Sequence, residues 1–317
     1  HALSRPGISS LTYRNFLIRR SLRIFPGFLL ILAIHLLLNQ ADVREKLGWY
    51  LFGVVNFNFA MHGWQGGADQ FWTLAIEQQF YLLWPLALIF LPRKYALPIL
   101  IAAFLLPTLA RVLPTLVGPN LLSSFLRPDT LFGEELEMRG KLTWNCFDYL
   151  AAGCLYAYAR REAWPFPKAL GHTIGAVSTV LYLLIRTGYL RDILPAELKI
   201  FQQFTLILGT VWVIHLAADG IPGLIGKILE HPAFQSIGTR SYGLYLYHNF
   251  VAAIFYIAFR KHELGMEWYP AIFLLCGAIV WAMACLSWRY LEEPIYRRKN
   301  RFPYTLNIPN EKSLTPR

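Results

Sequence analysis

The sequence predicts an all-helical protein that crosses a membrane several times. Of its 317 residues, 56% are hydrophobic and only 15% are charged, whereas soluble domains carry about 25% charged residues. Apolar runs long enough for a spanning helix recur along the chain. Backbone groups in lipid must satisfy their own hydrogen bonds, and a helix does so within one segment. The expected fold class is therefore all-α, a polytopic transmembrane helix bundle.

Each span is expected where about 20 predominantly apolar residues follow one another. We expect eight spans, near residues 24–40, 71–91, 95–113, 144–159, 169–188, 200–218, 241–259 and 269–290. The apolar segment 45–60 is broken by Asn56 and Asn58, so we expect it to be interfacial or re-entrant. Residues 1–317 are expected to form one membrane-embedded domain, with residues 298–317 as a cytoplasmic tail.

Basic residues between the spans indicate how the chain lies in the membrane, because loops rich in Lys and Arg stay in the cytoplasm. With eight spans, one side carries Arg14, Arg19, Arg20, Arg23, Arg93, Lys94, Arg160, Arg161, Lys227, Arg240, Arg297, Arg298, Lys299 and Arg301. Arg260 and Lys261 are the exception on the other side. Both ends of this chain are then cytoplasmic. The net charge of +11 follows from this topology, so nucleic acid is not an expected partner.

Several common catalytic signatures are missing from the sequence. The chain has no Walker loop, no HExxH and no GxSxG motif, which argues against nucleotide hydrolysis, metalloprotease and serine hydrolase chemistry. The four cysteines lie in apolar segments without a CxxC pair. We read them as small buried hydrophobes and expect no metal site.

Residues 71–85, FWTLAIEQQFYLLWP, place the carboxylate of Glu77 inside an apolar run. A charge within a membrane span costs about 2.5–3.5 kcal/mol on insertion scales, and such residues commonly face a polar cavity. Glu77 and Tyr81 are four residues apart, so they share one helix face. Alternatively, Glu77 reaches interfacial water near the helix end, and the flanking Trp72 and Trp84 form an interfacial belt.

A basic cluster, IRRSLRIFPGF, precedes the first expected span. Its Arg20 and Arg23 are three residues apart and lie on one face of a helix. Two guanidinium groups held there can bind phosphate oxygens bidentately. The alternative is a topogenic cluster that contacts anionic lipid head groups.

A polar stripe follows the motif RSYGLYLYH, residues 240–248. Ser241, Tyr245 and His248 fall at i, i+4 and i+7 on an otherwise apolar helix. His is well suited to proton transfer near neutral pH. Such stripes can also serve only for hydrogen bonds between helices. In the later motif WRYLEEP, we expect Glu292 and Glu293 to have a structural, topology-locking role.

Five segments, in order, resemble the integral-membrane acyltransferase-3 family, the bacterial O-acetylases of surface polysaccharides. They are RRSLRIFPGF, FWTLAIEQQFYLLWP, FDYLAAGCLYA, IGTRSYGLYLYH and WRYLEEP, and they extend over nearly the whole chain. The resemblance implies about ten spans in the parent protein and a location in the bacterial inner membrane. It also implies acetyl-CoA as the donor substrate, with no permanently bound cofactor, and a glycan or glycolipid hydroxyl as the acceptor.

The mechanism that this resemblance implies is direct acyl transfer. A general base deprotonates the acceptor hydroxyl as it attacks the thioester carbonyl, and polar groups stabilise the oxyanion. The catalytic candidates are Glu77 and His248. Arg20 and Arg23 are expected to hold the phosphates of CoA, and Trp72 to stack on a sugar. The cavity is expected to be lined by Tyr81, Ser241, Tyr242 and Tyr245.

The chain begins at His1, directly ahead of the basic cluster, without a signal-peptide pattern. Family members have two spans before this cluster, and the first holds the principal catalytic His. We therefore expect a piece of a longer protein, lacking these two helices and its main general base, and inactive alone. His35 follows Arg23 by twelve residues, but its RIFP context fits the third span of the family, so we regard this spacing as a coincidence.

Two other functions are compatible with the same residues. A proton-coupled transporter or flippase of a glycan or another solute would use an intramembrane Glu and His, although the chain has no repeat and no matching pair of interrupted helices. A non-catalytic membrane scaffold would tolerate changes at every polar position named above. Binding of acetyl-CoA would separate the acyltransferase from both.

Overall fold

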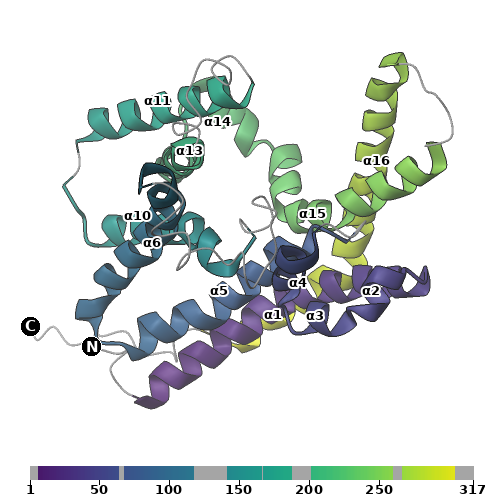
Figure 1. Ribbon diagram of the computed structural model, residues 1–317, viewed down its shortest axis with the longest axis horizontal. Coiled ribbons are helices and arrows are strands. Elements are labelled where there is room, and N and C mark those ends of the chain that lie inside the picture. The colour runs from purple at the N-terminus through teal and green to yellow at the C-terminus, as the bar shows by residue number, and fades with distance from the viewer. Residues whose placement is uncertain are drawn as a thin grey trace, which may run out of the picture. The chain divides into compact units, whose positions relative to one another are not determined.

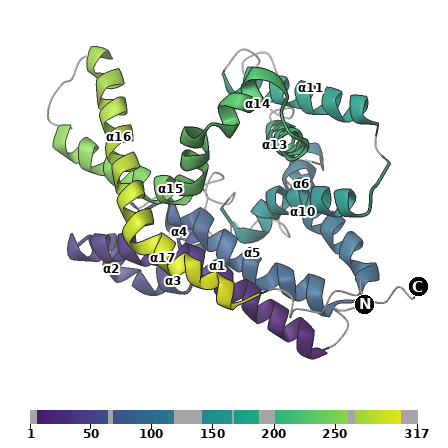
Figure 2. The same cartoon turned by 180° about the vertical axis from the view of Figure 1, so that it is seen from behind.

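The computed structural model describes residues 6–63, 68–117, 141–165, 167–187, 201–259 and 266–303. Within these ranges all regular elements are helical (Figures 1 and 2), which confirms the all-α class. The α-helices are α1 (Pro6–Leu37), α2 (Ala41–Glu45), α3 (Leu47–Leu51), α4 (Val55–His62), α5 (Phe71–Phe90), α6 (Ala96–Val117), α10 (Phe147–Arg161), α11 (Lys168–Arg186), α13 (Phe201–Asp219), α14 (Gly223–Glu230), α15 (Pro232–Phe259), α16 (Tyr269–Ser287) and α17 (Glu293–Tyr296). Between α16 and α17, the π-helix η5 covers Trp288–Glu292.

Each expected span coincides with a long helix, but the helices and the apolar runs do not share their ends. The helix of the first span, α1, begins at Pro6 rather than near residue 24, because the basic cluster is itself helical. By length and apolar composition, three helices of the described residues can cross a membrane, namely Ser10–Leu37, Lys168–Arg186 and Tyr269–Arg301. A fourth results if α13 and α14 count together. The total of eight spans stays a prediction.

The segment 45–60 forms short helices, α3 and part of α4, and none is long enough to cross a bilayer. Asn56 is fully buried. Its side-chain amide donates to the carbonyl of Lys141 at 3.1 Å and to Oγ1 of Thr143 at 2.9 Å. The asparagine that interrupts the apolar pattern is therefore a packing residue with paired donors.

The chain divides into two compact units. The first unit comprises residues 1–55, 64–91 and 236–317, and the second comprises residues 56–63 and 92–235. Each unit combines segments that are far apart in the sequence. The expected single domain over residues 1–317 is not tested by this division.

In the first unit, α1 and α5 lie side by side, and η5 and α17 pack against α1 (Figures 1 and 2). Arg19 of α1 donates to the carbonyls of Lys299 and Phe302 at 3.0 and 3.2 Å. Asn15 donates to the carbonyl of Pro303 at 2.7 Å. The basic N-terminal half of α1 therefore binds the segment that follows α17.

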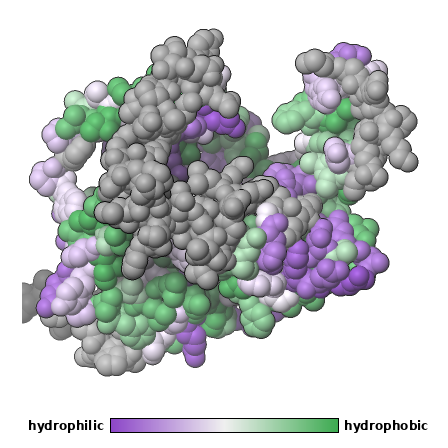
Figure 3. Space-filling view, in the orientation of Figure 1, coloured by the Kyte–Doolittle hydropathy of each residue, from purple (hydrophilic) through white to green (hydrophobic). Residues whose placement is uncertain are grey.

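The outer surface of this unit differs between its helices. On the face in Figure 3, hydrophilic residues gather over α2 and α3, and hydrophobic residues cover much of α1 and α5. The exposed large apolar side chains of α1 and α5 include Leu29, Leu30, Leu82, Leu83 and Phe90. Such a surface fits lipid around α1 and α5.

In the second unit, α11 and α13 make the most extensive helix pair. Their backbones approach closely at two glycines, as is typical of helix pairs in membranes. A Cβ built at Gly175 would lie 2.1 Å from Cγ of Trp212, and one at Gly209 would lie 2.7 Å from Oγ1 of Thr179. The indole of Trp212 also donates to Nδ1 of His172 at 3.1 Å, which fixes the ring over Gly175.

Gly175→Ala is expected to destabilise the protein by about 1–3 kcal/mol, the usual cost of inserting a methylene into a packed interface. Thermal unfolding in detergent would measure the change as a lower Tm. Gly153→Ala is the matched control, because a Cβ at this position in α10 meets no atom within 4 Å. Equal Tm values for the two variants would contradict the close contact between α11 and α13.

Candidate functional site

A cavity of about 440 Å³ lies between α5 and α15, within the first unit. It is lined by Thr73, Leu74, Glu77, Ser241, Tyr242 and Tyr245. The spacing of four residues between Thr73 and Glu77, and between Ser241 and Tyr245, turns each pair toward one side of its helix. Four residues singled out from the sequence, Glu77, Ser241, Tyr242 and Tyr245, therefore meet in one cavity, although Glu77 lies more than 160 positions before the other three in the sequence.

Glu77 is half-buried in this cavity. Among the described residues its carboxylate makes no hydrogen bond, and the positive charge of Arg20 acts on it from α1. A partly buried carboxylate normally has hydrogen-bond partners. The free lone pairs of Glu77 can accept a hydrogen bond from a ligand hydroxyl that enters the cavity.

The floor of the cavity is held by a hydrogen-bonded cluster around Gln70, the residue before α5. The hydroxyl of Tyr245 donates to the carbonyl of Gln70 at 2.9 Å and also contacts the hydroxyl of Thr73. The buried side chain of Gln70 donates to the carbonyl of Leu246 at 3.1 Å and accepts from Asn249 at 3.3 Å. Gln70 thus ties the start of α5 to α15 and orients Tyr245. The sequence analysis missed Gln70, because a polar residue just before an apolar run looks like an ordinary loop residue.

Tyr242 connects the cavity to α1. Its hydroxyl donates to the carbonyl of Ile24 at 2.7 Å. Beside it, a Cβ at Gly27 would lie 2.8 Å from Cδ1 of Leu246 and 3.2 Å from the ring of Tyr242. The glycine that follows Pro26 in the basic cluster therefore allows α15 to approach α1 closely enough for this hydrogen bond.

Glu292 lies on the same junction, at the end of the π-helix η5. It is only 2% exposed, and its Oε1 accepts a hydrogen bond from the hydroxyl of Ser287 at 2.7 Å. The same oxygen lies 3.5 Å from the Cβ positions built at Gly27 and at Gly243. π-Helical turns commonly occur at functional sites. Here the turn places a buried carboxylate between α1 and α15, while Glu293 bonds Arg297 on the surface at 2.8 Å.

Arg23 does not face the cavity. Its guanidinium lies over the ring of Trp288 at 4.6 Å and that of Tyr296 at 5.3 Å. It also donates to the carbonyl of Thr239 at 2.9 Å. Arg23 therefore holds the last helix and the start of α15 against α1.

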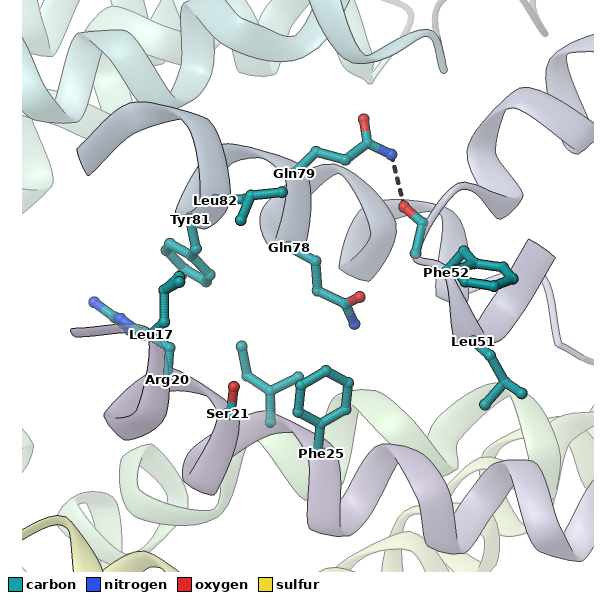
Figure 4. A pocket seen from close by; sticks show the side chains of 12 residues that line it. Leu17, Arg20, Ser21, Phe25, Leu51, Phe52, Gln78, Gln79, Tyr81 and Leu82 are labelled. Carbon is teal, nitrogen blue, oxygen red and sulfur yellow. Dashed lines mark hydrogen bonds between the residues drawn. The ribbon is translucent and has the colours of Figure 1, made fainter. Parts of the chain in front are cut away.

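Arg20 lies instead at a second cavity, of about 350 Å³, between α1, α5 and the turn after α3 (Figure 4). Its guanidinium is 4.6 Å from the ring of Tyr81 and 5.6 Å from that of Phe16. In Figure 4, Arg20 and Tyr81 lie at one end of this cavity and the apolar Leu51 and Phe52 at the other. The cavity thus has a cationic end and an apolar end.

The turn that closes the second cavity requires a glycine. Gly53 has a φ of +65°, and a Cβ there would lie 2.5 Å from Oε1 of Gln78. The carbonyl of Gly53 accepts a hydrogen bond from Gln79 at 2.7 Å, drawn as the dashed line in Figure 4. The adjacent glutamines of α5 thus position the apolar end of the cavity.

Besides Arg23, two predicted site residues lie outside both cavities. His248 is exposed, and its Nδ1 donates to the carbonyl of Tyr245 at 2.6 Å. It does not line the cavity that contains Glu77, because i+7 continues the stripe past the end of that cavity. Trp72 lies on α5 and lines neither cavity. The sequence pattern grouped His248 and Trp72 with Glu77, but the packing of the helices does not bring either residue into the cavity that contains Glu77.

His35 is fully buried in the core of the first unit. Its Nδ1 lies 2.6 Å from Oε1 of Gln40, and its ring packs edge-on against Phe71 and Phe250. It lines neither cavity. This environment fits a packing role for His35 in the core of the first unit.

The sequence is similar to a family model and to several curated proteins. The acyltransferase domain model (Acyl_transf_3) matches residues 3–287. The peptidoglycan O-acetyltransferase OatA of Listeria monocytogenes is 26% identical over 92% of this chain and 47% of its own length. The putative peptidoglycan O-acetyltransferase YrhL of Bacillus subtilis is 23% identical over 90% of this chain and 46% of its own length. The chain thus spans about half the length of these relatives. No solved structure matches it significantly.

Proposed function

Because the chain belongs to the acyltransferase family of the Acyl_transf_3 model, we propose that it transfers an acyl group, acetyl by analogy with the relatives, from acyl-CoA to a hydroxyl of a cell-envelope glycan. The observation that carries this proposal is the cavity between α5 and α15, where Glu77 has no hydrogen-bond partner among the described residues. The relatives named as peptidoglycan O-acetyltransferases support a glycan as acceptor.

The donor would bind at the second cavity. The guanidinium of Arg20 offers the phosphates of CoA a cationic anchor at one end of this cavity, and the thioester would have to reach the neighbouring cavity that contains Glu77. Charge-assisted bonds from Arg to phosphate are about twice as strong as neutral hydrogen bonds. Arg23 would act as a positioning residue, since its guanidinium is bound to Thr239 and the aromatic rings.

The acceptor hydroxyl would bind at the cavity that contains Glu77. Its oxygen attacks the carbonyl carbon of the thioester, the new ester C–O bond forms, the C–S bond breaks, and CoA leaves as the thiol. Glu77 would take the proton of the attacking hydroxyl and return it to the departing sulfur, while Ser241 and Tyr245 orient the sugar. General base catalysis of this kind contributes about 10²–10⁴-fold to the rate. For His248 to act as the base, its ring would have to turn toward the cavity, so the geometry favours Glu77.

The proposal is tested with bacterial membranes that contain the complete protein. Acetyl-CoA carrying an isotopically labelled acetyl group should yield a labelled, alkali-labile ester on the envelope glycan, detected by mass spectrometry of its fragments. Membranes without the protein are the control. Binding of acetyl-CoA without transfer to any hydroxyl, or transport of a glycan without ester formation, would refute the proposed function. The position in the inner membrane and the eight spans are part of the same proposal.

A further inference from the structure

The helix α14 forms a rigid corner with α13, the helix of the sixth expected span. The two helix axes meet at 83° across a break of a few residues. Gly220 in this break and Gly223 at the start of α14 have φ values of +87° and +75°, a region that favours glycine. A Cβ at Gly226 would lie 1.8 Å from the carbonyl oxygen of Ile221. Three glycines therefore allow the backbone to fold tightly against the first turn of α14.

The surface of α14 is sharply divided. Its large apolar side chains are Leu224, Ile225, Ile228 and Leu229, which fall on one face and are 73%, 64%, 43% and 41% exposed. Lys227 and Glu230 lie on the other side of the helix and are also exposed. The end of α14 is closed by Gln235, which donates to the carbonyl of Leu229 at 3.0 Å. The helix is thus complete, amphipathic and uncovered on its apolar face within the described residues.

We propose that α14 lies in the membrane interface and contacts the lipid of the cytoplasmic leaflet with its apolar face. A helix at nearly a right angle to a spanning helix runs parallel to the membrane plane. Moving apolar side chains out of water is favourable by about 25 cal/mol for each Å² of surface. Contact with lipid removes the apolar face of α14 from water in this way. The opposite face carries two charges, which oppose deeper insertion. The basic residues that indicate the cytoplasmic side include Lys227, in α14 itself. An amphipathic helix with these properties inserts about 5–10 Å into the head-group boundary.

Spin labels on α14 test this assignment in liposomes that contain the whole chain. The native cysteines are first replaced by alanine, and retained folding is checked by circular dichroism. Single cysteines then replace the residue of interest, as Leu224→Cys and Ile228→Cys on the apolar face and Lys227→Cys and Glu230→Cys on the polar face. The relative collision rates of each label with oxygen and with a water-soluble nickel complex report its depth.

The proposal expects labels at positions 224 and 228 about 5–10 Å below the lipid phosphates, and labels at 227 and 230 accessible to nickel. Val180→Cys is a control for deeper lipid contact, because Val180 is exposed on α11, which can cross the membrane. Three results would overturn the proposal. In the first, all four labels are equally accessible to nickel, as on a helix in water. In the second, labels at 224 and 228 are shielded from both oxygen and nickel, as under another protein segment. In the third, all four labels lie as deep as the control, as in a re-entrant loop.

Discussion

Glu77→Gln is expected to reduce acyl transfer by about 10²–10⁴-fold, the range that a positioned general base contributes. The amide keeps the size and shape of the side chain but loses the carboxylate that accepts the proton. Glu77 lies in the cavity without a hydrogen-bond partner among the described residues, so the substitution breaks no described hydrogen bond, although it removes the charge on which Arg20 acts. The rate of ester formation in membranes with equal amounts of protein measures the effect.

The matched control for this experiment is Glu230→Gln, the same chemical change on the exposed face of α14. It should leave the transfer rate unchanged. The Tm of Glu77→Gln should equal that of the unaltered protein within a few degrees. If Glu77→Gln retains full transfer at this Tm, the carboxylate has no role in proton transfer, and Glu77 is a structural residue that reaches interfacial water.

Arg20→Ala and Arg23→Ala are expected to fail in different ways, although the sequence pattern treats them as one pair. Arg20→Ala should raise the KM for acyl-CoA about 10- to 100-fold, because a hydrogen bond to a charged group contributes about 1.5–3 kcal/mol. Its guanidinium is exposed, contacts the rings of Phe16 and Tyr81 and makes no hydrogen bond to the described residues, so the Tm should fall less than in Arg23→Ala. Steady-state kinetics across acyl-CoA concentrations would measure this difference.

Arg23→Ala should instead lower the Tm. It removes the hydrogen bond to the carbonyl of Thr239 and the stacking on Trp288, and a cation–π contact contributes about 0.5–2 kcal/mol. Arg14→Ala is the control, because Arg14 is exposed on α1. An unchanged KM in Arg20→Ala would exclude Arg20 as the anchor of the donor phosphates. A raised KM with a normal Tm in Arg23→Ala would instead show that Arg20 and Arg23 bind the phosphates of CoA together.

Much of this protein can be read from local patterns along the chain. Hydrophobic composition and apolar runs predict helices, and each expected span coincides with one in the structure. The spacing of four residues predicts that Ser241 and Tyr245 lie on one side of their helix, and both line the same cavity in the structure. These features depend on neighbouring residues in one helix, and the helical period relates such neighbours directly.

The features that sequence patterns missed depend on contacts between distant segments. Arg20 and Arg23 share a helix face, yet one meets Tyr81 and the other Trp288, because α5 and the last helix pack on different sides of α1. His248 continues the polar stripe of α15 but lies beyond the cavity. Gln70 has no distinctive pattern, and its importance comes from hydrogen bonds to Leu246 and Asn249. Helical periodicity can place side chains around an axis, whereas the choice of neighbour on each side is made when the helices pack.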